Sequence, residues 1–216
     1  MGIPVLILGE SGTGKSYAMR NIAGHAAIIN VLNKPLPFRS AGIKTASSRD
    51  IERVRKWALG AKANSIIVDD FGYLITDMYM RYSYGDEKYR DQFEVYKKIA
   101  HDVYALVTAI QDMPADKIVY LTMHTDNSSG GIEPLTIGKM LNEKIKLVGM
   151  FTITLLSMCQ GKEYQFVTNG MPPAKTPPGM FDERIPNDLM AVDTAIREYY
   201  GLKPLVEAQP KAEIEG

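Results

Sequence analysis

The feature that most constrains the fold of this chain is the glycine-rich segment Gly9–Ser16, which reads GESGTGKS. It matches the pattern G-x-x-x-x-G-K-[ST] at every fixed position. Glycines permit backbone dihedral angles closed to other residues, so that consecutive N–H groups can point at one anion. An apolar run, Val5–Leu8, precedes the segment, and a helix is expected over residues 15–23, ended by Gly24. We therefore expect a strand, a phosphate-binding loop and a helix in this order.

The chemistry of this pattern is nucleotide binding. Lys15 is expected to reach the β- and γ-phosphates of ATP as a catalytic residue, and the Ser16 hydroxyl to complete the shell of a Mg²⁺ ion. The positive end of the following helix favours the same anion. Glycine-rich turns before helices also occur without a ligand, but the strand before and the helix after favour the nucleotide interpretation. The residues expected to contact ATP are Gly9, Glu10, Ser11, Gly12, Thr13, Gly14, Lys15, Ser16 and Tyr17.

Two adjacent acids follow another apolar run. The expected strand Ser65–Val68 is succeeded directly by Asp69 and Asp70. Ligands of open α/β sheets bind at the carboxyl ends of the strands, and an acid there can hold Mg²⁺ directly or through water. We assign Asp69 as the Mg²⁺ carboxylate and Asp70 as the catalytic residue that orients and deprotonates the attacking water. For Asp70, a helix cap or a solvated turn is an equally good explanation.

A third polar position ends the strand expected over residues 117–123. If this strand neighbours the one that ends at Asp69, Thr122 or His124 would face the γ-phosphate and could sense the state of the nucleotide. His124 is therefore the third catalytic candidate. A single histidine is more often a structural residue, and that alternative stays open.

Strand and helix patterns alternate along the rest of the chain. Further strands are predicted at residues 27–31, 150–156 and 164–167, and further helices at 48–59, 89–111, 134–143 and 187–200. Ser48 is the expected N-cap of the first of these helices. The alternation predicts an α/β fold with a mostly parallel central sheet flanked by helices and an antiparallel hairpin at one edge. Residues 1–202 are expected to form one domain and residues 203–216 a flexible C-terminal tail.

Composition argues against several classes of protein. No apolar run approaches the roughly 20 residues that a bilayer core requires, so no membrane association is expected. The start of the chain lacks the pattern of a signal peptide. The single cysteine, Cys159, fits a reducing cytosol. With three histidines it argues against a structural zinc site.

The 25 basic and 25 acidic side chains give a formal net charge of zero, which at first argues against a nucleic acid partner. The charges are not evenly spread, however. Residues 34–62 carry eight basic groups against two acidic ones, and residues 63–143 carry seven against thirteen, so the two blocks have net charges of +6 and −6. Neutrality therefore does not exclude DNA. It predicts modest, nucleotide-dependent affinity from local loops, and protomers with opposed charge blocks could stack head to tail.

Taken together, the loop Gly9–Ser16, the strand ending in Asp69 and Asp70, and His124 closing the next strand resemble the RecA-like P-loop ATPase core. The closer resemblance is to the small phage AAA-type ATPases of single-strand annealing and recombination. It covers about residues 1–200, and less specific parts of it lie at residues 138–144, 181–182 and 185–189.

The resemblance implies ATP binding and hydrolysis with Mg²⁺, and assembly into a homo-oligomeric ring or filament. It also implies action on single-stranded DNA in the cytoplasm of a bacterial host cell, with a single-strand-binding protein as a further partner.

The chain departs from this family at one position of chemical importance. RecA-like proteins usually carry a catalytic glutamate after the second core strand, whereas the stretch Asn30–Lys34 contains no acid here. Either Asp70 takes this role or hydrolysis is slow. The departure motivates a second hypothesis, a nucleotide-gated scaffold that recruits a replication or recombination partner with little hydrolysis. A third and less favoured hypothesis is a small-molecule kinase built on the same loop.

Three segments are candidates for contact with DNA: the loop Thr125–Pro134, the tyrosine-rich segment 78–90 and the basic block 34–62. Segment 78–90 could equally be a lid or a subunit interface. In the basic block, Arg49, Arg53 and Lys56 are expected on one helix face, which could simply be solvated.

Ring and filament ATPases complete each site with a cation from the neighbouring subunit. The candidates for this cation are Lys139, Lys144, Lys146 and Arg184. Each of them could also be an ordinary surface residue.

Overall fold

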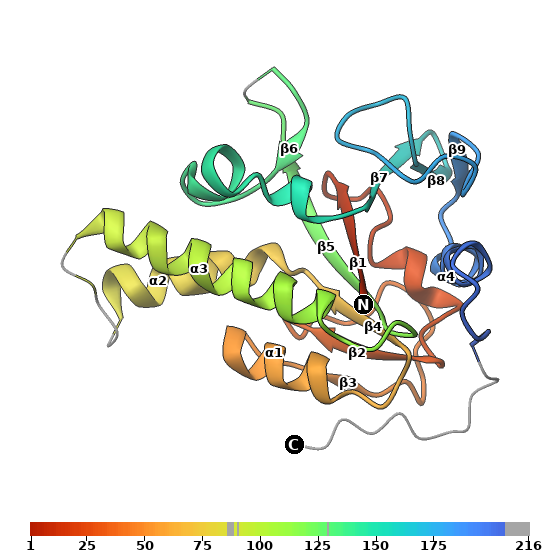
Figure 1. Ribbon diagram of the computed structural model, residues 1–216, viewed down its shortest axis with the longest axis horizontal. Helices are drawn as coiled ribbons and strands as arrows, with labels where there is room; N and C mark the ends of the chain where they lie inside the picture. The colour runs from red at the N-terminus through yellow and green to blue at the C-terminus, as the bar shows by residue number, and fades with distance from the viewer. Residues whose placement is uncertain (86–88, 90, 129, 206–216) are drawn as a thin grey trace.

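A mostly parallel β-sheet forms the middle layer of the protein, and helices cover both of its faces (Figure 1). The computed structural model describes residues 1–85, 89, 91–128 and 130–205. Among these residues the strand order is β3-β2-β4-β5-β1-β7-β8-β9, with β6 paired to β5. The strands are β1 (Ile3–Gly9), β2 (Ala26–Asn30), β3 (Thr45–Ala46), β4 (Ser65–Asp69), β5 (Ile118–Asp126), β6 (Glu133–Pro134), β7 (Ile153–Gln160), β8 (Glu163–Val167) and β9 (Arg184–Pro186).

The neighbours from β3 to β7 in this order all run parallel. Strands β7 and β8 form an antiparallel hairpin, and β9 pairs antiparallel with β8 at the edge. The predicted α/β fold with a mostly parallel sheet and an antiparallel hairpin is therefore confirmed. Strand β9, which was not predicted, lies outside the hairpin.

Successive residues of the central strands point to opposite faces of the sheet. On β1, Leu6 and Leu8 belong to one buried apolar cluster, and Val5 and Ile7 belong to a second cluster. The first cluster lies under helices α1 (Ile51–Gly60), α2 (Gly72–Tyr84) and α3 (Gln92–Gln111). The second lies under the short 3-10 helix η1 (Tyr17–Arg20) and helix α4 (Leu189–Tyr199).

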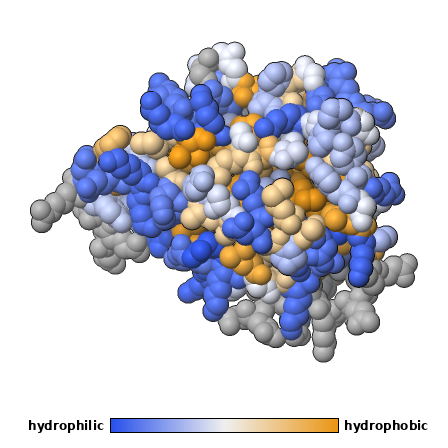
Figure 2. Space-filling view, in the orientation of Figure 1, coloured by the Kyte–Doolittle hydropathy of each residue, from blue (hydrophilic) through white to orange (hydrophobic). Residues whose placement is uncertain are grey.

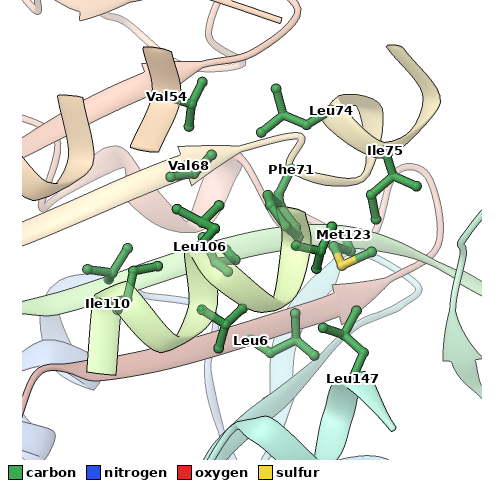
Figure 3. Close-up of a cluster of buried hydrophobic side chains, with 14 of the residues drawn as sticks. Leu6, Val54, Val68, Phe71, Leu74, Ile75, Leu106, Ile110, Met123 and Leu147 are labelled. Carbon is green, nitrogen blue, oxygen red and sulfur yellow. The ribbon is translucent and has the colours of Figure 1, made fainter. Parts of the chain in front are cut away.

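The larger cluster is the main core of the protein. Phe71 at the start of α2, Leu74 of α2, and Leu106 and Ile110 of α3 belong to this cluster together with Leu6 of the sheet (Figure 3). All five side chains are fully buried, and burying one side chain of this size contributes about 1.5–3 kcal/mol. Helices α2 and α3 are thereby fixed against the same strands whose ends form the candidate site.

Several predicted elements differ in the structure. The helix expected over residues 15–23 is reduced to the short helix η1, with mixed turns on either side. The Met19 carbonyl, for example, accepts from Ala23 N, four residues on, and also from Ile22 N, three residues on. A helix this short has little aligned dipole, so its N-terminus adds little to anion binding. Ser48 is not a helix N-cap: α1 begins after Asp50, whose carboxylate accepts from Arg53 N.

The region after β5 was also predicted wrongly. Pro134 does not open a helix, because it pairs with Thr125 in the β5–β6 ladder. The helical residues come later, as the π-helix η2 (Met140–Ile145) and the 3-10 helix η3 (Leu147–Met150). Helix α2 was not predicted at all, and α3 begins at Gln92, later than the expected residue 89.

The C-terminal tail was predicted to start at residue 203. The carbonyl of Lys203 accepts from Arg197, and Leu205 packs against the second apolar cluster. Residues 206–216 lie outside the described residues. In the described part of the chain, no helix combines the length and apolar character needed to cross a membrane. The face seen in Figure 2 has hydrophilic residues interspersed with smaller hydrophobic patches.

A buried ion pair within α4 takes part in hydrogen bonds that link this helix to the central strands β4 and β5. Arg197 and Asp193 are both almost fully buried, and the guanidinium donates to the carboxylate. Asp193 also accepts from Ser65 Oγ of β4 at 2.6 Å and from Tyr120 OH of β5 at 2.9 Å. Burial and the neighbouring Asp193 carboxylate raise the pKa of Tyr120 well above its ordinary value. The network therefore holds α4, β4 and β5 in one arrangement.

Asp193→Ala is expected to lower the free energy of unfolding by about 3–5 kcal/mol, because it leaves a buried guanidinium without its carboxylate. Urea unfolding followed by circular dichroism measures the change. The control is Glu52→Ala, which removes the exposed Glu52–Arg55 pair of α1 and should cost less than about 1 kcal/mol. Small and equal losses in the two variants would contradict a structural role for the network.

Candidate functional site

The glycine-rich segment forms a loop that folds back on its own lysine. Lys15 is buried, and its Nζ donates to Gly9 O and Glu10 O, each at 2.8 Å. Burial lowers the pKa of Lys15 from 10.5 to about 8, against the opposing attraction of Asp70 and Asp69. The ammonium is thus held at the centre of the loop, with acidic groups close by.

Two of the loop glycines are required by the surrounding atoms. A Cβ on Gly9 would lie 2.6 Å from Thr13 Oγ1 and 2.7 Å from Ser157 O. Gly14 has a φ of +94°, and a Cβ there would lie 2.7 Å from the Tyr164 ring. The pattern of glycines therefore reflects close contacts inside the loop and with the β7–β8 hairpin.

The rear of the loop is held by residues that were not predicted. Ser157 Oγ of β7 donates to Thr13 O at 2.7 Å, and Asn187 Nδ2 donates to Ser157 Oγ at 3.3 Å. The backbone carbonyl of Asn187 accepts from Arg20 at 2.7 Å. Ser157 lies within β7, one residue beyond the Leu156 that pairs with β1. The sequence signal that could have pointed to it is its place directly after the strand predicted at residues 150–156.

The first acid after β4 joins the loop directly. Ser16 Oγ donates to Asp69 Oδ1 at 3.0 Å, and Thr122 Oγ1 of β5 donates to the same oxygen at 2.9 Å. Asp69 is buried, and its burial together with the charge of Asp70 raises its pKa. The structure therefore brings together the two residues expected to hold Mg²⁺, with Thr122 as a third member.

The second acid lies at a turn in the left-handed conformation, with a φ of 62°. Asp70 N donates to Thr122 Oγ1 at 2.8 Å. The Asp70 carboxylate contacts Lys34 Nζ at 2.8 Å and lies 3.9 Å from His124 Nε2. Asp70 is also buried, and the N-cap of α2 is Phe71. Neither a helix cap nor a solvated turn describes this carboxylate, which faces charged groups of the site.

His124 stands where β5 passes the end of β1. It pairs in register with Gly9, and its Nδ1 lies 3.4 Å from Lys15 Nζ. The Tyr73 ring meets the imidazole edge-on, with the ring centroids 5.9 Å apart. Burial and the neighbouring Lys15 ammonium lower the pKa of His124. The histidine therefore touches the catalytic candidates on both sides.

A cavity of about 880 Å³ opens over these residues, which is a size typical of small-molecule sites. Of the predicted site residues, it is lined by Glu10, Ser11, Gly12, Gly14, Lys15, Ser16, Tyr17, Asp70 and His124. Gly9, Thr13 and Asp69 do not line it, but each is hydrogen-bonded to a residue that does. Lys34, Tyr73 and Tyr164 were not predicted as site residues and also line the cavity.

Comparison with models of protein families found no match, and comparison with curated proteins found none either. The geometry of the site therefore carries the functional argument.

The donor set of this cavity is compatible with Mg²⁺. The described residues contain no cluster of three or more His, Cys, Asp or Glu side chains suited to a metal. Mg²⁺ does not require such a cluster, because it usually takes one or two carboxylates together with phosphate oxygens and water. The Ser16 hydroxyl and the Asp69 carboxylate, already in contact, are oxygen donors of the required kind.

The candidate cations for a neighbouring subunit lie elsewhere. Lys139, Lys144, Lys146 and Arg184 do not line the cavity. Lys139 is highly exposed and pairs with Glu143 at 3.4 Å, and Arg184 lies on the edge strand β9. That one of them supplies a cation to the site of a neighbouring subunit therefore stays a prediction.

The DNA candidates are placed as follows. Residues Thr125–Asn127 of the loop Thr125–Pro134 line the cavity. In segment 78–90, Tyr79 stacks on Tyr96 of α3, and the buried Tyr82 donates to Asp102; residues 86–88 and 90 lie outside the described residues.

In the basic block, Arg49 precedes α1 and does not share its face as predicted. The helix begins at Ile51 and carries Arg53 and Lys56, both exposed.

Gly14→Ala is expected to lower the free energy of unfolding by about 1–3 kcal/mol, because the site combines a positive φ with the Tyr164 ring. The matched control is Gly24→Ala, where a Cβ meets nothing within 4 Å, so its effect should stay within about 0.5 kcal/mol. Urea unfolding of both variants measures the difference. Equal stabilities would show that the loop does not need its left-handed glycine.

Proposed function

We propose that this protein is a RecA-like P-loop ATPase that binds ATP with Mg²⁺ in the cavity over Lys15 and hydrolyses it. The observation that carries the proposal is the 3.0 Å hydrogen bond between Ser16 of the glycine-rich loop and Asp69 at the end of β4. It joins the two motifs, more than fifty residues apart in sequence, that the chemistry of ATP requires at one place.

The strand order supports the finer assignment of the fold. Strand β5 lies between β1 and β4, so the polar residues at its end stand between the glycine-rich loop and the acids. Thr122 bonds both to Asp69 and to the Asp70 backbone. This is the position expected of a residue that senses the γ-phosphate in a RecA-like core.

Each side chain of the site has a role suited to its surroundings. Loop N–H groups and Lys15 bind the phosphates, and Ser16 and Asp69 hold Mg²⁺, which when bound neutralises charge on the phosphate oxygens. Asp70 orients a water molecule and accepts its proton. His124, between Lys15 and Asp70, keeps these two groups apart and reports whether the phosphate is present.

Two aromatic residues beside the glycine-rich loop, one from η1 and one from β8, suit a nucleotide base. Tyr17 and Tyr164 both line the cavity, and their ring centroids are 5.7 Å apart. The Arg20 guanidinium lies 4.4 Å from the Tyr17 ring centroid, which holds that ring in place. Both rings are partly exposed, so their faces are accessible for stacking.

The resemblance carries the rest of the proposal, which is action on single-stranded DNA as a homo-oligomeric ring or filament, together with a single-strand-binding protein. One contact favours a link between DNA and nucleotide. Asn127 Nδ2, in the candidate DNA loop, donates to Glu10 Oε1 of the glycine-rich loop at 2.6 Å. A change in either loop would reach the other through this bond.

The nucleotide-gated scaffold remains the second candidate, and one observation favours it. The carboxylate of Asp70 is paired with Lys34 at 2.8 Å, so one of the two oxygens that could accept a proton from water already contacts an ammonium group. In that case ATP would act mainly as a ligand, and hydrolysis would be slow.

Lys15→Ala is expected to reduce ATP turnover by on the order of 100-fold, because it removes the cation that stabilises charge on the transferred phosphate. Turnover is measured with and without single-stranded DNA, and Lys203→Ala, an exposed lysine beyond α4, serves as the control. Equal turnover in wild type and Lys15→Ala would refute the ATPase assignment. Asp70→Asn then separates the two candidates, since rapid turnover that this variant abolishes excludes the scaffold.

Asn127→Ala is expected to weaken the dependence of DNA binding on nucleotide. We expect a non-hydrolysable ATP analogue to increase the particle size of the protein. We expect it also to increase the affinity for single-stranded DNA, by on the order of tenfold. This affinity should fall steeply as the salt concentration rises. Light scattering and DNA titration with and without the analogue measure both effects. Ser128→Ala, in the same loop, is the control. If the analogue does not change the DNA affinity of the wild-type protein, the proposed link between nucleotide binding and DNA binding is contradicted.

A further inference from the structure

Lys34 is a second lysine of the cavity, and no motif points to it. It follows β2, whose last residue Asn30 pairs in register with Asp69 of β4, so Lys34 arrives at the same edge of the sheet as the acids. Its Nζ lies 2.8 Å from Asp70 Oδ2, and its side chain lines the cavity. In the sequence it is only the first of eight basic residues in a long basic block.

The turn after β2 is built to present this lysine. The buried Asn30 side chain holds the Lys34 backbone from both sides, because its Nδ2 donates to Lys34 O at 2.6 Å and its Oδ1 accepts from Lys34 N at 3.2 Å. Asn33 adopts the left-handed conformation, with a φ of 53°, which asparagine tolerates better than most residues. The fixed backbone of Lys34 therefore directs its side chain to Asp70 and the cavity.

The Lys34 ammonium has a defined but accessible position. It lies 5.4 Å from the centroid of the Tyr73 ring, within reach of a cation–π contact. Hydrogen bonding to Asp70 and its charge raise the pKa of Lys34 in spite of partial burial. The side chain keeps 54% of its surface exposed, whereas that of Asp70 keeps 10%. An ammonium has three donors, so the ion pair with Asp70 leaves donors for an anion in the cavity.

The charged groups form a sequence along one wall of the cavity. Lys15 contacts His124 at 3.4 Å, His124 lies 3.9 Å from Asp70, and Asp70 contacts Lys34 at 2.8 Å. The two ammonium groups therefore stand on opposite sides of the histidine and the acid. Lys15 is the lysine of the glycine-rich loop, and the proposed function assigns Asp70 to the attacking water. The second ammonium therefore lies next to the residue that would act at the terminal phosphate.

We propose that Lys34 is a cation that this chain itself supplies to the terminal phosphate of the nucleotide, and that its ion pair with Asp70 positions it there. The inference rests on the proposed ATP site. Lys34 selects the triphosphate over the diphosphate, because only the triphosphate reaches the ammonium. Each protomer thereby supplies this positive group to its own site. The sequence had suggested that a neighbouring subunit supplies it, with the candidates Lys139, Lys144, Lys146 and Arg184.

The test is nucleotide affinity, measured by calorimetry with a non-hydrolysable ATP analogue and with ADP in the absence of DNA. Lys34→Ala is expected to weaken binding of the analogue by about tenfold or more, the effect of one charged hydrogen bond, and binding of ADP by less than about twofold. Lys34→Arg should retain most of the analogue affinity. Lys44→Ala, an exposed lysine of the same basic block, is the matched control and should change neither.

A double variant separates contact with phosphate from simple neutralisation of Asp70. If Lys34 only screens the Asp70 charge, Lys34→Ala combined with Asp70→Asn restores the affinity for the analogue, and the inference is wrong. If Lys34 binds the phosphate, the double variant stays as weak as Lys34→Ala. Equal loss of both nucleotides in Lys34→Ala would also overturn the inference.

Failure of the inference is distinguishable from failure of the ATP site. If Lys15→Ala leaves both affinities unchanged, the proposed site itself is wrong. If Lys15→Ala weakens both and Lys34→Ala weakens neither, only the role of Lys34 is wrong. Lys34→Met, which keeps the aliphatic stem beside Tyr73, replaces Lys34→Ala if unfolding experiments show that the alanine variant is destabilised.

Discussion

The hydrogen-bonded register of four parallel strands determines the geometry of the whole site. Gly9 of β1 pairs with His124 of β5, and Asn30 of β2 pairs with Asp69 of β4. A shift of β5 by one residue would exchange its two faces and remove Thr122 from both acids. The ladder therefore explains why residues from four separate segments meet, although no single side-chain contact is strong enough to assemble them. The buried Asp193–Arg197 pair helps at the opposite end, because it bonds to β4 and β5 together.

Much of this arrangement could be predicted from local sequence. The glycine-rich loop, the acids after β4, His124 and the β7–β8 hairpin each carry a pattern within a few consecutive residues, and the structure places them as expected. Lys34 carries no such pattern, and Asn187 lies only in a less specific part of the resemblance. The roles of both depend on turns that bring distant segments to the site. Helix α2 was missed for a different reason. Its aromatic and β-branched residues have weak helix propensity, and the contacts of Tyr79 and Tyr82 with α3 stabilise it.

The carboxyl edge of the sheet concentrates charges that oppose one another. Asp69 and Asp70 are adjacent and both buried, and burial together with the charge of Asp70 raises the pKa of Asp69. Two lysines and two hydroxyl donors surround them, and Asp70 keeps a left-handed backbone that most residues avoid. Buried charge and backbone strain at one place are typical of functional sites rather than of structural ones. At the other end of the sheet, by contrast, the buried charges of Asp193 and Arg197 form a matched pair.

The contacts also change the meaning of the neutral net charge. Two blocks of opposite charge suggested a protomer with separate positive and negative regions that could stack on its neighbours. Yet Lys34, from the basic block, pairs with Asp70 of the acidic block, and Arg81, from the acidic block, pairs with Asp50 of the basic one. Part of the opposition is therefore neutralised within the protomer, because β2 and β4 are neighbours in the sheet and α1 lies near α2. If the protein binds DNA as proposed, the exposed side chains of the basic block, among them Arg53 and Lys56 of α1, are available for that contact. Lys34 instead pairs with Asp70 in the cavity.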